Sequence, residues 1–174
     1  MLAYAGDDAD AFEVLYTRHK GPVYRYMLNL CRNESIAEEL FQEVWMKVIH
    51  ARHQYRPSAK FTTYLYRLAH NLFIDHYRKQ NVRIVVDNSV EPEHLQQQSD
   101  VDNPEQLLQA DETEHRFARL LLALPNEQRE VFLLHEEAGM SLKDIADTIG
   151  INHEAAKSRL RYAIKKLRDG LREN

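Results

Sequence analysis

The last part of the chain concentrates positive charge on one side of a helical pattern. Residues 157–172 include seven basic side chains and one acid, Asp169. At about 100° per residue, one face holds Lys157, Ser158, Arg161, Lys165 and Arg168. The other face holds Ala156, Leu160, Ala163, Ile164 and Leu167. Ammonium and guanidinium groups contact DNA phosphates and read base edges in the major groove, so the basic face is a candidate DNA-binding surface.

The residues before this segment predict the turn that positions it. An apolar repeat at helical spacing, from Ile145 to Ile149, ends at Gly150, which can adopt the left-handed conformation of a helix C-cap. Asn152 or His153 can then begin the next helix. Helix, tight turn and basic helix together favour a helix-turn-helix that binds duplex DNA. The charges alone would also fit a solvated face of a helical hairpin.

A second group of candidate residues mixes aromatic rings with cations. Residues 52–79 contain six aromatic and six basic side chains. Rings stack on unpaired bases and cations meet phosphates, so this composition favours binding of single-stranded nucleic acid. Leu65, Leu72 and Phe73 are expected in the core, although more of the rings could also serve only to fill it. The remaining candidates for DNA contact are Tyr64, Arg67, Asn71 and Arg78.

A third segment, residues 36–49, has one apolar and one mainly acidic face. Its core stripe consists of Ile36, Leu40, Val44 and Val48, widened by Phe41 and Trp45. Its outer face holds Glu38, Glu39, Gln42, Met46 and Ile49. Apolar side chains among acids on an outer face could dock a partner helix, and they could equally belong to an ordinary solvated face.

The composition gives little support for catalysis. Cys31 is the single cysteine, which excludes an intrachain disulfide, and the nine histidines are scattered without metal-ligand spacing. There is no Gly-rich phosphate loop and no nucleophile motif. We therefore expect no enzyme, no metal site and no cofactor. No apolar run approaches the ~20 residues that span a bilayer, so we expect a cytoplasmic protein without membrane insertion.

The chain is predicted to be all-α, with two small helical domains. It has only five glycines and five prolines, and strand-like alternation is nearly absent. Residues 81–105 hold six acids against one base, which is typical of a linker. The expected organisation is a domain at 1–80, a flexible acidic linker at 81–105, and a helix-turn-helix domain at 106–174.

Two helix boundaries follow from local signals. Gly21-Pro22 is expected to interrupt the first helix of the chain, because proline cannot donate the helical hydrogen bond. A later helix is expected to run from about Thr62 to Arg78. No internal repeat is present.

Five sequence segments occur in order along both predicted domains. They are Asp10-Ala-Phe12 with Tyr16; Ala37-Glu-Glu-Leu-Phe-Gln-Glu-Val44; Phe61-Thr-Thr-Tyr-Leu-Tyr-Arg-Leu-Ala-His-Asn71 with Asp75-His-Tyr-Arg78; Leu124-Pro125 with Gln128-Arg-Glu-Val-Phe132; and Ser141, Ile145-Ala146, Gly150 and Lys157-Ser-Arg159. Together they closely resemble a bacterial extracytoplasmic-function (ECF) sigma factor, over residues 10–79 and 106–170.

The resemblance implies a factor that binds core RNA polymerase, recognises the promoter minus-ten and minus-thirty-five elements and initiates transcription under the control of an anti-sigma factor. It places polymerase binding on Glu38, Glu39, Gln42, Glu43 and Met46. It places contacts to the opened, single-stranded minus-ten element on Lys60, Phe61, Thr62, Tyr64, Arg67, Asn71 and Arg78. It places contacts to the duplex minus-thirty-five element on Lys157, Ser158, Arg159, Arg161, Tyr162 and Lys165.

Three positions depart from the family pattern. Tyr64 stands where the family usually has tryptophan, and Ala156 stands where valine commonly precedes Lys-Ser-Arg. Tyr162 replaces the arginine usual at that position, so a basic contact to DNA shifts by one residue along the helix.

One rival function uses the same helix-turn-helix. A regulator that binds duplex DNA as a dimer would need this helix pair, and it would bind isolated palindromic DNA tightly. It would have no use for the aromatic and basic residues of 60–79, which the sigma-factor hypothesis explains.

Overall fold

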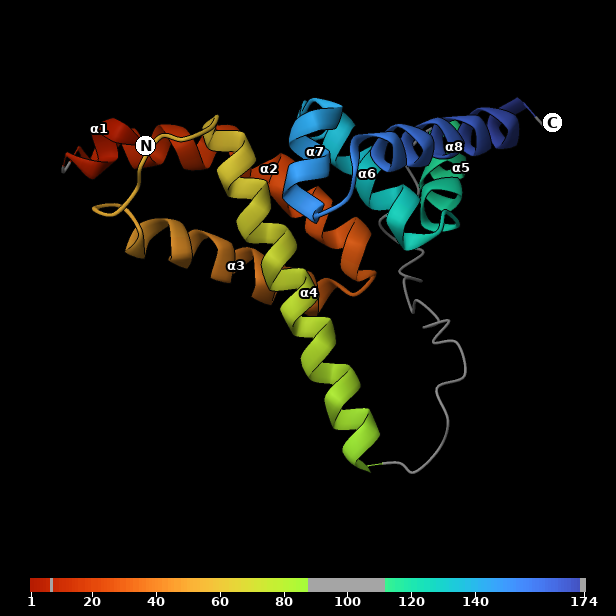
Figure 1. Ribbon diagram of the computed structural model, residues 1–174, viewed down its shortest axis with the longest axis horizontal. Coiled ribbons are helices and arrows are strands. Elements are labelled where there is room, and N and C mark those ends of the chain that lie inside the picture. Colours follow the sequence, from red (N-terminus) through yellow and green to blue (C-terminus); the bar gives the residue numbers. More distant parts are fainter. Residues whose placement is uncertain (7, 88–111, 173–174) are drawn as a thin grey trace.

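The computed structural model describes residues 1–6, 8–87 and 112–172, and every regular element in these ranges is a helix. This confirms the all-α class. The elements, shown in Figure 1, are α1 (Leu2–Ala5), α2 (Ala9–Cys31), α3 (Glu34–His50), α4 (Phe61–Asp87), α5 (Glu112–Leu122), α6 (Asn126–Glu136), α7 (Leu142–Ile149) and α8 (His153–Arg172). The expected linker lies outside the described residues from position 88 onward.

Short polar side chains determine where several helices begin. The side chain of Asp8 accepts a hydrogen bond from the backbone N–H of Ala11 at 3.1 Å, at the start of α2. Asn33 caps α3 in the same way, through an N–H three residues later at 3.0 Å. Such a cap contributes about 1 kcal/mol, because it satisfies a backbone donor that has no partner inside the helix.

The core of the first domain forms where α2, α3 and α4 pack together. The stripe predicted on α3 is confirmed: Leu40, Val44 and Val48 are buried, as is Trp45. Leu65, Leu72 and Phe73 of α4 are buried too, as expected. Rings from α2 extend this core, because the Trp45 ring meets those of Phe12 and Tyr16 edge-on, at centroid distances of 6.0 and 4.9 Å.

The second domain is built around α8, which packs against α5, α6 and α7. Its predicted apolar face is confirmed by the burial of Ala156, Leu160, Ala163 and Leu167. Near its end, Gly170 allows α8 to approach α5 closely. A Cβ at this position would lie 2.4 Å from Cδ2 of Leu120, well inside van der Waals contact.

A buried arginine ties α5 to α6. Arg129 has no exposed surface. Its Nη1 donates to the backbone oxygens of Leu122 and Leu124, each at 3.1 Å, and Nη2 donates to the side chain of Asn126 at 2.8 Å. The two carbonyls lie at the end of α5, where a helix leaves acceptors without partners. Burial, followed by the nearby charge of Arg32, lowers the pKa of Arg129 to about 10, so the group is still a cation at neutral pH.

The expected break at Gly21-Pro22 is wrong. Helix α2 continues through Pro22 to Cys31, although proline removes one hydrogen bond of the helix. Tertiary packing explains this result, because apolar residues on both sides of the proline bury against the same core. Phe12 and Tyr16 precede it, and Val23 follows it with no exposed surface.

Helix α4 is longer than its sequence pattern indicates. It begins at Phe61 and continues to Asp87, nine residues beyond the predicted end at Arg78. The sequence offers no glycine or proline between Arg78 and Pro92 to end the helix earlier. The first seven residues of the expected linker are therefore helical.

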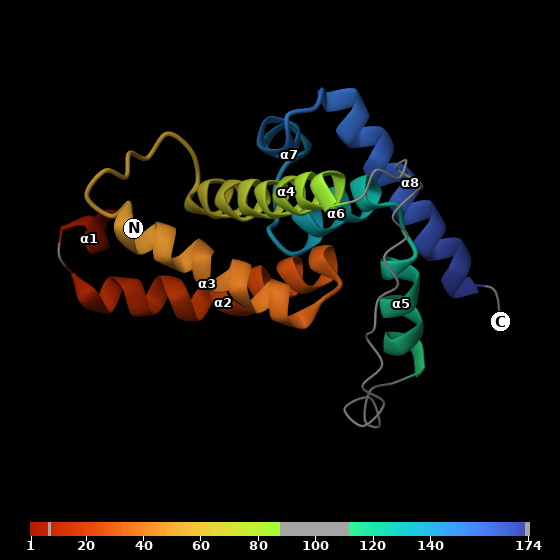
Figure 2. The ribbon, with the colours of Figure 1, turned by 90° about the horizontal axis from the view of Figure 1, so that it is seen from below.

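The two domains pack directly on each other. Helix α4 lies against α7, and α2 lies against α6. Figure 1 shows α6 and α7 beside the second half of α2 and the first half of α4, and Figure 2 shows the same neighbours from below.

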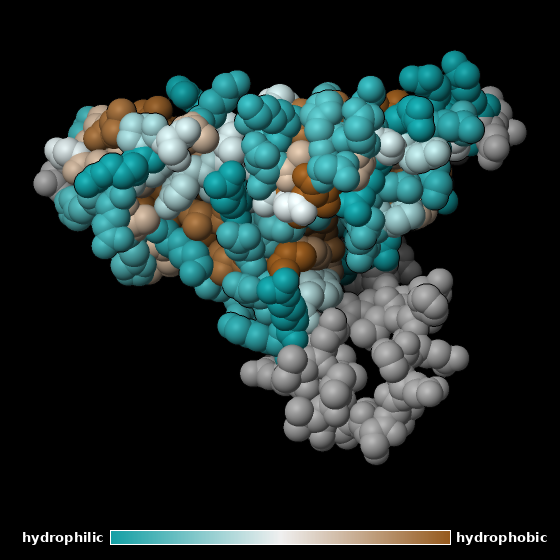
Figure 3. All heavy atoms as spheres, viewed as in Figure 1, coloured by the Kyte–Doolittle hydropathy of each residue, from teal (hydrophilic) through white to brown (hydrophobic). Residues whose placement is uncertain are grey.

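The surface seen in Figure 3 is mainly hydrophilic, and its apolar side chains form small separate patches. Within the described residues, no helix is both long enough and apolar enough to cross a membrane.

Candidate nucleic-acid and polymerase interfaces

The predicted helix-turn-helix is present in α7 and α8. Ser141 caps α7 by accepting from the backbone N–H of Asp144 at 3.2 Å. Gly150 ends α7 with φ 71° and ψ 36°, the left-handed conformation expected from the sequence. Asn152 then accepts from the N–H of Ala155 at 2.7 Å, which fixes the start of α8. These local bonds hold the two helices in a fixed orientation.

The outer face of α8 presents most of its predicted DNA-binding residues to solvent. Lys157, Arg161, Tyr162 and Lys165 are exposed, and Ser158 between them is half-buried. The guanidinium of Arg161 lies over the ring of Tyr162, 5.2 Å from its centroid. This stacking holds both groups on the same side of the helix, where they form a basic surface with an aromatic component.

Arg159 has a different environment. Its Nη2 lies 2.6 Å from Oε2 of Glu127 at the start of α6, and its side chain is only 26% exposed. Around the α8 axis it lies about 200° from Arg161. Arg159 therefore links α8 to α6 and is not part of the exposed basic face.

Three predicted minus-ten residues form a line along α4. Arg67, Asn71 and Arg78 are all exposed. Steps of four and seven residues keep them within about 40° of one another around the helix. We call these three residues the α4 stripe. Two cations flank an amide with both donor and acceptor atoms, a combination that can bind phosphates and one base edge.

The aromatic candidates lie at the start of α4. Phe61 and Tyr64 are half-buried, and their centroids lie 6.4 and 5.1 Å from the ring of Tyr55, which is buried. Partial burial, followed by the neighbouring Tyr55, raises the pKa of Tyr64. Both rings thus have one face in a packed cluster and some surface left for a base. Thr62 beside them is half-buried, and Lys60 just before the helix is exposed.

The predicted polymerase-binding residues share the outer face of α3. Glu38, Glu39, Gln42, Glu43 and Met46 are all exposed. Met46 keeps 49% of its surface exposed and adds an apolar side chain to this acidic face. We call these five residues the α3 face.

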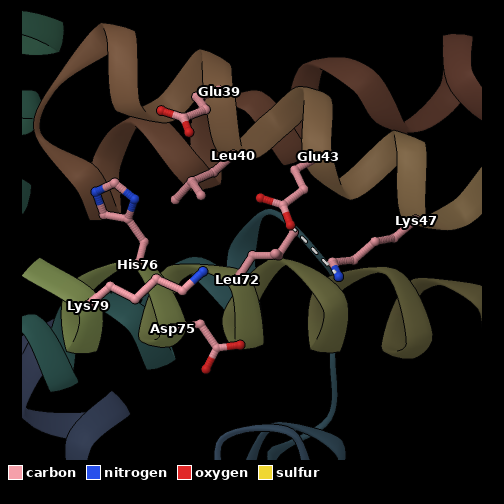
Figure 4. Close-up of a pocket in the computed structure, with 8 residues that line it drawn as sticks. All are labelled: Glu39, Leu40, Glu43, Lys47, Leu72, Asp75, His76 and Lys79. Atoms are coloured by element: carbon pink, nitrogen blue, oxygen red, sulfur yellow. Dashed lines mark ion pairs between the residues drawn. The ribbon is translucent and has the colours of Figure 1, made fainter.

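A polar groove connects the α3 face with α4. It has a volume of about 430 Å³ and, as Figure 4 shows, side chains from both helices enter it. From α3 come Glu39, Leu40, Glu43 and Lys47, and from α4 come Leu72, Asp75, His76 and Lys79. Glu43 and Lys47 form an ion pair at 3.7 Å across one turn of α3. The groove adds three charged or titratable residues of α4 to the candidate surface.

Sequence reasoning did not identify the polar contacts between the domains. Glu130 of α6 and His70 of α4 are 60 positions apart, and the pair of Arg25 and Glu137 is 112 positions apart. No periodicity or motif connects such positions. The groove residues of α4 were accessible to prediction, because Asp75, His76 and Lys79 recur at helical spacing beside the core stripe.

Family models match both halves of the chain. The model described as sigma-70 region 2 matches residues 15–83, which include α3, most of α2 and the greater part of α4. The model described as sigma-70, region 4 matches residues 114–167, which include the helix-turn-helix.

A relative decides the family. The ECF RNA polymerase sigma factor SigL of Mycobacterium tuberculosis is 31% identical over 175 residues, covering 97% of this chain and 93% of the relative. The chain is an ECF RNA polymerase sigma factor. A second relative is the ECF RNA polymerase sigma factor SigE of Mycolicibacterium smegmatis, which is 29% identical over 95% of the present chain. The present chain spans only 64% of the length of SigE.

A solved structure has the same fold. The sigma factor RpoE of Bartonella quintana, determined in complex with the anti-sigma factor NepR, superposes with a TM-score of 0.71 at 21% identity. The superposition covers 95% of the present chain and 99% of the RpoE chain.

Family membership answers two of the sequence-based questions. Sigma factors are transcription initiation factors and not enzymes, so the expectation of a non-enzymatic, DNA-binding protein is confirmed. The region 2 match also argues against a simple dimeric helix-turn-helix regulator, which has no need of such a domain.

Proposed function

We propose that the sigma factor divides promoter recognition between its two domains, with boundaries at 1–80, 81–105 and 106–174. The α3 face, comprising Glu38, Glu39, Gln42, Glu43 and Met46, binds core RNA polymerase. Lys60, Phe61, Thr62, Tyr64 and the α4 stripe bind the opened minus-ten element. Lys157, Ser158, Arg161, Tyr162 and Lys165 of α8 read the duplex minus-thirty-five element, and Arg159 supports that helix.

The observation that carries this proposal is the placement of the α4 stripe. Its cations and amide are exposed beside half-buried rings at the start of the same helix. Aromatic stacking contributes about 1–3 kcal/mol per base, and it requires bases that are not paired. Helix α8, in contrast, presents cations spaced for a groove of intact duplex. The two surfaces therefore suit two different states of DNA.

The proposal also includes location and control. A transcription initiation factor without a membrane-spanning helix in its described residues works in the cytoplasm, where the polymerase and promoter DNA are. We assign it an anti-sigma partner, which the complex of the Bartonella quintana protein with NepR supports. The acidic residues of 81–105 would follow the RNA exit path of the polymerase, where negative charge imitates nucleic acid.

Three sets of variants test the division of labour. The double variant Gln42→Lys/Glu43→Lys should lose binding to core RNA polymerase while keeping its helical content. The double variant Arg67→Ala/Asn71→Ala should still bind polymerase and promoter DNA, but it should no longer open the promoter. Promoter opening is measured by the reactivity of unpaired thymines toward permanganate. Arg161→Ala should weaken promoter binding itself.

The control for the polymerase variants is Glu13→Lys, a charge reversal at an exposed acid on α2 that is equal to the change at Glu43 alone. It should bind polymerase normally. Normal polymerase affinity in the folded Gln42→Lys/Glu43→Lys protein would refute the α3 face as the docking surface. Equal loss at every step in all three sets would refute the division between domains.

A further inference from the structure

Tyr162 is an aromatic side chain among charged and hydroxyl-bearing neighbours on α8. It is the only phenylalanine, tyrosine or tryptophan of that helix, and 50% of its surface is exposed. The residues one turn away from it are Ser158, Lys165 and Lys166. Tyr162 takes no part in the packed core of the residues that the structure describes. Packing therefore gives no reason for a ring at this position.

Arg161 holds the ring on the outward side of the helix. Leu160 and Ala163 are buried and define the inward direction of this part of α8. Arg161 and Tyr162 each lie about 50° from the opposite direction, one on either side of it. The guanidinium carbon of Arg161 lies over the ring, 5.2 Å from its centroid, and covers one of its faces. The exposed remainder of the ring is therefore presented at the surface that α8 turns toward DNA.

The major groove of duplex DNA offers few apolar groups to such a ring. The base edges present hydrogen-bond donors and acceptors, and the 5-methyl group of thymine is the apolar group among them. Stacking of a ring on a base requires unpaired bases, which an intact duplex does not supply. The hydroxyl of a tyrosine can also bind a phosphate, but that contact carries no sequence information. The thymine methyl is therefore the group in the groove that an aromatic ring can read.

We propose that Tyr162 determines specificity at one position of the minus-thirty-five element, where its ring contacts the 5-methyl group of a thymine. The inference rests on the proposed binding of that duplex by α8. Arg161 fixes the direction of the ring, so little side-chain freedom is lost when the contact forms. The contact buries one methyl group, which corresponds to about a fourfold difference in affinity between thymine and the same base without its methyl.

Deoxyuridine tests this contact, because it lacks only the methyl group of thymidine and pairs with adenine in the same way. Holoenzyme is bound to fluorescent promoter duplexes in which each thymine of the minus-thirty-five element, on either strand, is replaced in turn by deoxyuridine. The wild type should lose about fourfold in affinity at one position. Tyr162→Phe keeps the ring without the hydroxyl and should show the same loss at the same position. Tyr162→Ala should bind the thymine and deoxyuridine duplexes equally there.

Lys166→Ala is the matched control, since it shortens an exposed side chain one turn further along the same helix. It should retain the wild-type ratio of affinities between the thymine and deoxyuridine duplexes. Circular dichroism should show unchanged helical content in Tyr162→Ala, because the side chain lies outside the core.

A loss on deoxyuridine that persists in Tyr162→Ala would overturn the inference, as would the absence of any sensitive thymine from the element. Equal weakening of every duplex by Tyr162→Phe, without a sensitive thymine, would show that the hydroxyl binds a phosphate and the ring reads no base. The proposed function has a separate readout. A wild-type holoenzyme that binds intact and scrambled minus-thirty-five elements equally would refute DNA reading by α8, whereas the other outcomes refute only the role of Tyr162.

Discussion

Arg159 and Arg161 of α8 are two positions apart, and we expect their replacement to affect different properties. Loss of Arg161 should weaken DNA binding, whereas loss of Arg159 should lower the stability of the second domain. Arg161 is exposed and stacked on Tyr162, whereas Arg159 is paired with Glu127 on the far side of the helix. A groove can contact only one side of a helix, so Arg161→Ala should weaken binding to the minus-thirty-five element. Arg159→Ala should leave that binding unchanged.

The size of the effect follows from the contact that Arg161 makes. Loss of one phosphate contact lowers the slope of log Kobs against log salt by about 0.9, which is about 3.5-fold in affinity over a fourfold change in salt. Loss of a contact to a base costs about 1–3 kcal/mol, or about 5- to 150-fold. Arg161→Lys keeps the charge and loses the planar fork, so it should restore the slope but not the base contact. Arg159→Ala should cost the second domain only about 0.2–1 kcal/mol, since Glu127 is 70% exposed.

Fluorescence anisotropy with reconstituted holoenzyme can measure both effects. A promoter duplex with an intact minus-thirty-five element is compared with a duplex in which that element is scrambled. Both are titrated from 50 to 200 mM salt, a range wide enough to resolve a change of ~0.9 in the slope of log Kobs against log salt for each phosphate contact. The Arg161→Ala holoenzyme should discriminate poorly between the duplexes. An equal fall in slope for Arg159→Ala and Arg161→Ala would refute the assignment of the exposed face.

Three further predictions concern stability. Arg129→Met should lower the free energy of unfolding by about 2–4 kcal/mol. Burial, together with the nearby charge of Arg32, disfavours the cation by about 3 kcal/mol, as its pKa of about 10 against 12.5 indicates, but three hydrogen bonds from the charged guanidinium outweigh that cost. Gly150→Ala should cost about 1 kcal/mol, because φ is +71° there. Burial raises the pKa of Cys31 from 9.0 to about 12, so the neutral thiol stabilises the fold fully below pH 9, and this contribution is lost as the pH rises toward 12.

Denaturant titrations check all three. Arg119→Met, at an exposed position of α5, is the control for Arg129→Met and should change stability by less than about 0.5 kcal/mol. A cost below about 1 kcal/mol for Arg129→Met would show that water replaces its bonds. Between pH 8 and pH 10 the wild type should lose about 1.4 kcal/mol more than Cys31→Ala, and parallel curves would contradict the assignment. An Ala at position 150 that leaves stability unchanged would argue against a strained turn.

Periodicity was enough to predict the faces of α3, α4 and α8. Each helix has apolar residues that recur on one side, and burial of that side exposes the other, so Met46, Asn71 and Lys165 were placed correctly from the sequence. The Gly150 turn was predictable for the same local reason, since only its backbone freedom matters.

Features that depend on tertiary packing were not predictable. Pro22 normally signals a break, and only packing on both sides keeps α2 continuous. Arg159 carries the same charge as Arg161, and its pairing with Glu127 depends on where the first turn of α6 lies relative to α8. The contact of His70 with Glu130 likewise joins two domains whose relative position no local pattern encodes.

The burial of Cys31 limits the redox chemistry open to the folded sigma factor. Oxidants react with a thiolate that they can touch, and the side chain of Cys31 is only 3% exposed and holds its proton. A folded molecule therefore has no thiol with which to sense peroxide or a disulfide reagent directly, since Cys31 is the only cysteine of the sequence. Cys31 therefore cannot act as a direct redox switch while the protein is folded, and its thiol becomes reactive only when the core around it opens.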